Sequence, residues 1–271
     1  MNSIVLALLS AVIAIGPAKQ QPDSLALAKL DGMLEKYTSA ITGLGTEGKN
    51  AECDFLIASS NDSLIVQHVT LWLYDHYKDS PIMGEEAVAI HIYDRWLKDG
   101  TVKMRGEFDR FDAELFATFN RSTLLGMKAP RIELRTPKGR KTQMPVDGRY
   151  SILFFFDTSC GKCKLTTELM PSSLQKIKFP ACFYAVYCGH DEKAWKKFRK
   201  GFKVKNRKVD IVHLWDPDME SDYPRLYGVI STPRLYLTDT DGEILGRRLE
   251  IESLEEMISY INSYYEQAQK H

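Results

Sequence analysis

The sequence predicts an α/β domain with a central mixed sheet flanked by helices, preceded by an all-α N-terminal domain. In residues 24–120, apolar residues recur every three or four positions, as in helices with one buried face. Beyond Gly126, short apolar runs typical of strands alternate with segments of helix length. Residues 1–127 carry 11 Lys and Arg against 17 Asp and Glu, and the remainder carries 25 against 19. The net charge thus changes sign near residue 125, which supports a domain boundary there. We therefore expect domains at residues 22–122 and 125–271.

Composition sets the broad class of the protein. The chain has 271 residues, of which 44% are hydrophobic and 27% charged. These values are typical of globular proteins with a sizeable core and argue against intrinsic disorder. The formal net charge is zero, so overall charge gives no indication of a nucleic-acid partner.

The N-terminal domain is expected to consist of helices. Asp62 or Ser63 is a plausible N-cap for one of them, and Gly100 is suited to end another. Gly43 to Asn50 is interpreted as a loop. The predicted helices are Leu25–Ile41, Leu64–Tyr77, Glu85–Leu97 and Phe108–Phe119.

The C-terminal domain is expected to mix strands and helices. Tyr150 to Phe156 is apolar at nearly every position, as in a strand covered on both faces. Asp241-Gly242 predicts a tight hairpin turn. The predicted strands are 132–136, 141–144, 150–156, 183–188, 209–214, 234–238 and 244–248, and the predicted helices are 162–175, 191–200, 220–227 and 253–267.

A Cys-x-x-Cys motif, Cys160-Gly-Lys-Cys163, lies between the strand 150–156 and the helix that follows. At a helix N-terminus, unpaired backbone N–H groups and the helix dipole favour the thiolate of Cys160, the form that attacks disulfides. Cys163, one turn later, can resolve the mixed disulfide. The alternative is half of a zinc site, but no second Cys-x-x-Cys or suitably spaced His pair is present. We expect neither a metal nor an organic cofactor.

Two further segments complete a resemblance to known proteins. They are Tyr227-Gly-Val-Ile-Ser-Thr232-Pro233-Arg-Leu-Tyr-Leu and Asp239-Thr-Asp-Gly242-Glu-Ile. With Phe154 to Lys164, they resemble the thioredoxin fold and, within it, the exported TlpA-type proteins. The resemblance covers residues 125–271. It implies that Cys160 is the nucleophile, that Cys163 is the resolving thiol and that Pro233 is a cis-proline facing the disulfide. The alternative for Thr232-Pro233 is an ordinary trans turn.

The resemblance also suggests which residues meet the substrate. The backbone of Thr232 would offer an edge to an extended client segment. Ser159 stands where thioredoxins commonly have Trp, and Lys162 stands where they have Pro. We expect the Lys162 charge to lie near the Cys160 sulfur and to favour its thiolate. Thr232, Ser159 and Lys162 are therefore the candidate substrate-binding residues.

The acids that assist the resolving thiol in related proteins are missing. Phe154 replaces the buried acid of thioredoxin, and Thr166 replaces the helix glutamate of TlpA-type proteins. Glu168 is nearby but is expected on another helix face. Asp157 is the nearest candidate by sequence, and it could equally cap the turn before the helix.

The N-terminal segment Tyr74-Asp-His-Tyr to Gly84-Glu-Glu-Ala is similar to a helical domain of unknown function that precedes thioredoxin-like domains in bacterial cell-envelope proteins. Residues 1–18 contain an apolar run too short to span a bilayer, as in a cleaved signal peptide. The alternative is a short buried helix. Export to the periplasm or cell envelope follows, with membrane contact only through the signal peptide.

Three other cysteines and a basic segment remain. Cys53, Cys182 and Cys188 are interpreted as free thiols, and the last two are too far apart along one strand to pair. Lys193 to Lys208 contains nine basic residues. We interpret it as a solvated face, with anionic lipid or the acidic first half as alternative partners. No nucleic-acid partner is expected for an exported protein.

The sequence therefore predicts an exported thiol–disulfide oxidoreductase of the thioredoxin-like kind. Its partners would be protein thiols and disulfides and a redox partner protein. The alternative is a cell-envelope binding or scaffold protein with a weakly active or inactive thioredoxin-like domain. A peroxidase is disfavoured, because Asp157 stands where the Thr of the peroxidatic motif is needed.

Overall fold

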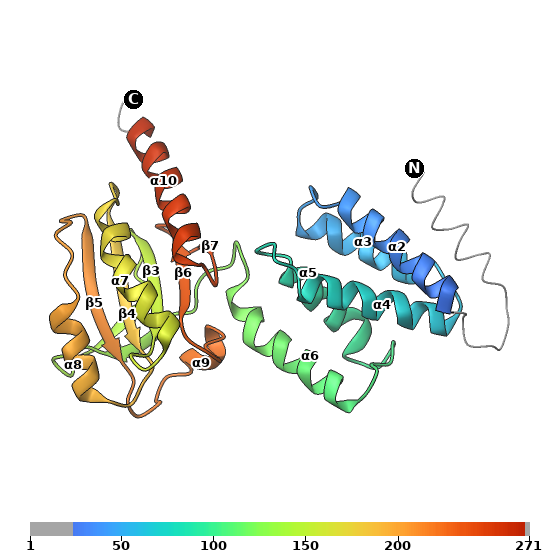
Figure 1. Cartoon of the computed structure of the whole chain (residues 1–271), viewed down its shortest axis with the longest axis horizontal. Coiled ribbons are helices and arrows are strands. Elements are labelled where there is room, and N and C mark those ends of the chain that lie inside the picture. The colour runs from blue at the N-terminus through green and yellow to red at the C-terminus, as the bar shows by residue number, and fades with distance from the viewer. Residues whose placement is uncertain (1–23, 269–271) are drawn as a thin grey trace. The chain divides into compact units, whose positions relative to one another are not determined.

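The computed structural model describes residues 24–268, which form two compact units divided between Ala117 and Thr118 (Figure 1). We call their described parts unit 1 and unit 2. The signal peptide predicted at residues 1–18 lies outside the described residues. Between residues 24 and 268, no helix has both the length and the apolar character needed to cross a membrane.

Unit 1 is helical. Asp62 caps α4 by accepting hydrogen bonds from the N–H groups of Leu64 and Ile65, so the predicted N-cap is confirmed. The core is formed by apolar side chains of α2 to α5, including Leu34, Leu56 and Leu73. The helices are α2 (Ser24–Ala40), α3 (Thr46–Ala58), α4 (Ser63–Lys78), α5 (Glu86–Ile92), the π-helical turn η1 (Tyr93–Leu97) and α6 (Glu107–Asn120), whose end belongs to unit 2.

One prediction for unit 1 was wrong, and one predicted helix has an irregular end. The expected loop at 43–50 contains the start of α3, whose first residues are too polar to show a helical pattern. A contact distant in sequence helps to hold this first turn, because the Lys49 ammonium pairs with Glu85 at 2.5 Å. The single helix expected at 85–97 changes to a π-helical turn at Tyr93, where the indole N–H of Trp96 donates to Asp54 at 2.7 Å.

Unit 2 contains one seven-stranded sheet, with the order β2-β1-β5-β4-β3-β6-β7. The central strand β3 runs parallel to β4 and antiparallel to β6. Both predicted hairpins are present, and Gly242 adopts the positive φ that its turn requires. The strands are β1 (Ile132–Arg135), β2 (Lys141–Met144), β3 (Tyr150–Phe156), β4 (Ala181–Tyr187), β5 (Val209–Trp215), β6 (Arg234–Thr238) and β7 (Ile244–Gly246).

Helices cover the sheet on both faces because the side chains of β3 alternate between two apolar clusters. Phe154 and Phe156 face the cluster beneath α7, α8 and α10, whereas Phe155 stacks on Tyr223 of α9. The helices are η2 (Arg121–Thr123), α7 (Gly161–Gln175), α8 (Glu192–Gly201), α9 (Tyr223–Leu226) and α10 (Ile251–Ala268). The helix predicted at 220–227 is shorter in the structure, where α9 begins only at Tyr223. The backbone N–H groups of Glu220 and Ser221 donate to the Asp216 carboxylate in the turn before it.

Candidate functional site

The Cys-x-x-Cys motif lies where the central strand ends and α7 begins. Cys160 is the N-cap of α7, with extended backbone angles. Asp157 organises the turn before it, because its Oδ1 accepts hydrogen bonds from the backbone N–H and the hydroxyl of Ser159, both at 2.8 Å. Asp157 therefore has the capping role that was one of its two sequence interpretations.

The Cys160 sulfur is surrounded by hydrogen-bonding groups. The backbone N–H of Cys163 donates to it at 3.2 Å, and its thiol donates to the carbonyl oxygen of Thr232 at 3.2 Å. Partial burial opposes ionisation, but hydrogen bonds from the thiol and backbone N–H of Cys163, the side chain of Thr232 and the backbone N–H of Lys162 outweigh it. The pKa of Cys160 consequently lies below the ordinary thiol value of 9.0.

Cys163 has the opposite character. Its side chain is 1% exposed, and burial, followed by its hydrogen bond with Cys160, raises its pKa to about 11. Both cysteines are present as free thiols. The pair thus combines a partly exposed, acidic thiol with a buried, weakly acidic one, an asymmetry suited to attack by Cys160 and resolution by Cys163.

The Thr232–Pro233 segment reaches the motif because of the sheet register. β6 pairs with β3 so that Arg234 lies opposite Phe155, one residue before the end of the central strand. This pairing places the Thr232 carbonyl beside Cys160. The Thr232–Pro233 peptide bond is cis, so the conformation implied by the resemblance is confirmed.

Lys162 differs from the expectation. Its ammonium forms an ion pair with Glu250 at 2.7 Å, and both side chains are 58% exposed. Its backbone N–H, rather than its charge, is among the groups that lower the pKa of Cys160. The charge itself is not among the main causes that lower this pKa, and Glu250 partly compensates it. Glu250 lies 88 residues away in sequence, so no local signal could have revealed the pair.

The positions where related proteins carry an acid beside the resolving thiol hold Phe154 and Thr166 here. Phe154 is fully buried, and the Thr166 hydroxyl donates to the Lys162 carbonyl at 3.0 Å. Glu168 and Cys163 both line a surface groove along α7. The main causes that shift the pKa of Cys163 are burial and hydrogen bonds with Cys160, Thr232 and the backbone of Asp157.

The remaining cysteines are free thiols, as predicted. Cys53 and Cys182 are buried. Cys188 follows β4, and its N–H donates to Phe156 at 2.8 Å, so it lies beside the end of the strand that carries the motif. Burial raises its pKa to about 12. Within residues 24–268, no cluster of three or more His, Cys, Asp or Glu side chains could hold a metal ion.

Comparisons with known proteins identify the fold. The structure of a thioredoxin-like protein from Bacteroides caccae matches 87% of this chain and 82% of its own, with a TM-score of 0.61 and 16% identity. The thioredoxin domain of a thiol-disulfide oxidoreductase from Bacteroides vulgatus covers 51% of this chain and 97% of its own, at 21% identity and a TM-score of 0.45. A thiol:disulfide interchange protein from Bacteroides sp. covers 52% and 92%, at 22% identity and a TM-score of 0.44.

The first of these matches shows that unit 2 has the thioredoxin fold, preceded by helices, as predicted. The match covers 87% of this chain, which is more than residues 118–271 could supply by themselves. The likeness therefore extends into the helices of unit 1. No protein-family model matches the chain, and no curated protein matches it. At these identities, the likeness concerns the fold, and function must be argued from the site.

Proposed function

We propose that this protein is an exported thiol–disulfide oxidoreductase that exchanges disulfides with protein clients through Cys160 and Cys163. The observation that carries the proposal is the asymmetry of the two thiols. One is accessible, with a lowered pKa, and the other is buried one helical turn away, with a raised pKa. The thioredoxin fold and the cis Thr232–Pro233 bond beside the motif are consistent with it.

The reaction balances without a cofactor. The Cys160 thiolate attacks a client disulfide, forming a mixed disulfide and releasing one client thiolate, which takes up a proton. Cys163 then loses its proton and attacks the Cys160 sulfur, releasing the second client thiol. The client gains two electrons, and Cys160 and Cys163 become a disulfide. The reverse sequence oxidises a client, and a redox partner protein restores the starting form in either direction.

The substrate-binding residues support the first of these steps. Once Cys160 enters a mixed disulfide it has no thiol proton to donate, so the Thr232 carbonyl becomes free to accept a client backbone N–H. Ser159 and Lys162 flank the attacking sulfur in sequence and are exposed, so they would contact the client. Pro233 shapes this edge. Export rests on the apolar run in residues 1–18 and on the resemblance to TlpA-type proteins.

A glutathione redox series read by thiol alkylation tests the proposal on wild type, Cys160→Ser and Cys163→Ser. We expect reversible exchange in wild type, none in Cys160→Ser, and a trapped glutathione mixed disulfide in Cys163→Ser. A potential near ~−270 mV would indicate a reductant, and one near ~−120 to −180 mV an oxidant or isomerase. Cys53→Ser is the matched control and should behave as wild type.

The absence of exchange at every glutathione poise would contradict the redox proposal. A weakly active or inactive thioredoxin-like domain would then favour the binding or scaffold alternative. The same experiment therefore separates the two functions.

A further inference from the structure

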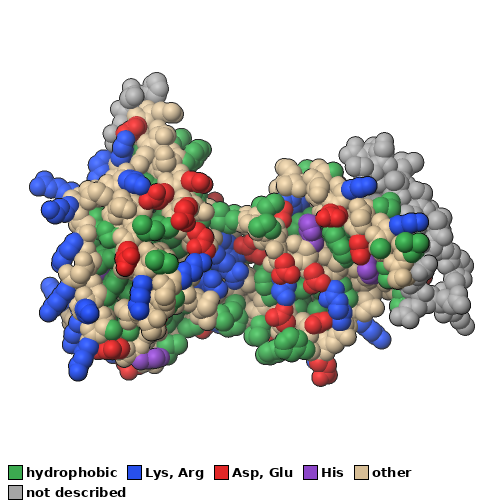
Figure 2. All heavy atoms as spheres, viewed as in Figure 1, with side chains coloured by type: hydrophobic (Ala, Val, Ile, Leu, Met, Phe, Trp, Pro, Cys, Tyr) green, Lys and Arg blue, Asp and Glu red, His purple; other side chains and the backbone are tan. Residues whose placement is uncertain are grey.

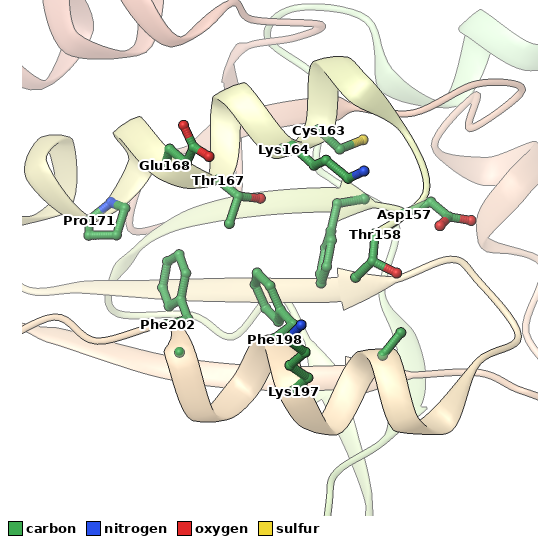
Figure 3. Close-up of a pocket in the computed structure, with 13 residues that line it drawn as sticks. Asp157, Thr158, Cys163, Lys164, Thr167, Glu168, Pro171, Lys197, Phe198 and Phe202 are labelled. Atoms are coloured by element: carbon green, nitrogen blue, oxygen red, sulfur yellow. The ribbon is translucent and has the colours of Figure 1, made fainter.

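A surface groove between α7 and α8 extends from Cys163 away from the residues proposed to bind the client. It is open rather than enclosed, with a volume of about 640 Å³. Figure 3 shows Phe198 and Phe202 rising from α8 toward α7, with Cys163 near one end of the groove and Pro171 at the other. Phe156 of the central strand also lines it. Three of its thirteen lining residues are aromatic, and a concave, partly apolar surface of this size can hold a bulky apolar side chain.

Lysines from both helices border this groove. Lys164 of α7 and Lys197 of α8 line it and are exposed. Within residues 24–268, neither ammonium has an ion-pair or hydrogen-bond partner. Two carboxylates also line the groove: Asp157, which accepts two hydrogen bonds from Ser159, and Glu168. The lining alone is therefore close to neutral, with its free cations on facing walls.

The surroundings of the groove are strongly basic. Lys193 to Lys208 contains nine Lys and Arg residues, and Glu192 is already paired with Lys196 at 2.9 Å. Figure 2 shows Lys and Arg side chains along the edge of unit 2 where α8 lies in Figure 1. The local electrostatic field therefore attracts an acidic partner toward the groove.

We propose that the α7–α8 groove docks an acidic segment of a partner protein. An aromatic or large apolar side chain of that segment packs against the half-buried ring of Phe198, above the nearly buried Phe156 and Phe202, and flanking carboxylates face Lys164 and Lys197. Because Cys163 lies at one end, the docked segment covers the resolving thiol. Docking does not require an active dithiol, so it can succeed or fail independently of the proposed exchange reaction.

The structure favours a protein segment over a membrane or a nucleic acid. A helix that binds a bilayer directs apolar side chains outward. In α8, Trp195 is buried and Phe198 packs on Phe156, whereas the exposed positions are mostly charged. Binding to single-stranded nucleic acid needs exposed aromatic rings among the basic residues, and α8 exposes none.

A short fluorescein-labelled peptide with one Phe between Asp and Glu residues is the probe, titrated against the full chain by fluorescence anisotropy. We expect saturable binding that weakens at least about tenfold when the peptide Phe is replaced by Ser, since the groove would lose a buried aromatic ring. Equal binding of the two peptides would overturn the proposal, because charge alone would then explain it.

Two sets of variants locate the binding site. Lys164→Ala with Lys197→Ala should weaken binding about tenfold. Lys176→Ala with Lys178→Ala is the matched control, since both lysines lie outside the groove and are ion-paired. Gly201→Leu should abolish binding, because Gly201 lines the groove and a Cβ there meets no atom within 4 Å. Gly32→Leu, another helical glycine with open space, is its control.

Alkylation of Cys163 in a Cys160→Ser background gives a second readout. Bound peptide should slow the reaction severalfold, and Gly201→Leu should remove that protection. Unchanged alkylation at saturating peptide would place binding elsewhere and overturn the proposal. Anionic phosphatidylglycerol vesicles that bind with the same Gly201 and lysine dependence would also overturn it, by making a membrane surface the occupant.

Discussion

Cys53 in unit 1 and Cys163 in unit 2 are buried to nearly the same degree, at 0% and 1% exposure. Burial is the main cause that raises the pKa of both, to about 12 for Cys53 and about 11 for Cys163. Cys53 lies inside α3, whereas Cys163 lies one turn after a second thiol at the start of α7. Burial by itself therefore produces an inert thiol, and the helix N-terminus with its paired cysteine produces a candidate site.

The largest expected difference between these regions is in thiol reactivity. Alkylation by iodoacetamide should proceed at neutral pH at least about a thousandfold faster at Cys160 than at Cys53, because only the thiolate reacts. The Cys160 rate should reach half its maximum below pH 9.0, since its pKa is lowered, whereas the Cys53 rate should still be rising above that pH. Mass spectrometry of peptides from quenched samples measures each site.

Cys163→Ala sharpens this test, because alanine, unlike serine, has no side-chain group that can donate to the Cys160 sulfur. It removes a thiol whose hydrogen bond lowers the pKa of Cys160, so the Cys160 profile should move to higher pH while Cys53 stays unchanged. A Cys160 midpoint at or above 9.0 in wild type would contradict the assigned asymmetry.

The two regions also differ in how they use ion pairs. Lys49 and Glu85 in unit 1 are buried and pair at 2.5 Å, and the Ser80 hydroxyl also donates to Glu85. Glu85→Ala leaves a buried ammonium without its partner, so it should destabilise unit 1 by ~3–5 kcal/mol. Urea unfolding followed by circular dichroism measures the loss.

The comparison variant is Glu250→Ala in unit 2, which removes the exposed partner of Lys162. Its cost should stay within ~0–1 kcal/mol, because solvent screens the pair. Equal losses from the two variants would show that burial does not decide the strength of these pairs. A Lys49→Met/Glu85→Leu double variant should recover most of the stability lost in Glu85→Ala.

Sequence reasoning found the features of unit 2 that are encoded locally. The apolar run of β3, the Cys-x-x-Cys motif at the start of α7 and the Asp241-Gly242 turn each have a signal within a few residues. The fold followed from their order together with a resemblance. The thiolate-stabilising contact from Cys163 N–H also follows from helix geometry alone.

Contacts between distant residues could not be predicted in the same way. Glu250 compensates Lys162 across 88 residues, and Lys49 holds the start of α3 through Glu85 across 36. The groove between α7 and α8 depends on how two helices pack over one sheet, which no single segment specifies. Unit 1 was predicted less completely because amphipathic periodicity identifies a helix but not its polar first turn.

The prediction with the smallest expected effect concerns the pH dependence of stability at two histidines. Burial lowers the pKa of both His76 in unit 1 and His213 in unit 2. Around His76 the carboxylates of Glu85 and Glu35 act in the opposite direction, whereas Arg199 and Lys203 lower the pKa of His213 further, to about 4. Because the charges around the two rings have opposite signs, the pH dependence of stability due to His213 should be larger than that due to His76.

The direction of the effect on stability follows from proton linkage. The folded pKa of His213 lies below its unfolded value of 6.5, so the unfolded chain binds more protons between about pH 4 and 6.5. His213 therefore costs no stability above pH 6.5 and progressively destabilises unit 2 as the pH falls toward 4. His213→Phe should reduce this loss, because the imidazole makes T-shaped contacts with the rings of Phe198 and Phe202 and a phenyl ring cannot be protonated. Urea midpoints at pH 7 and pH 5 test this for His213→Phe and His76→Phe. An equal gain from both variants would show that the charges around the two rings do not distinguish them.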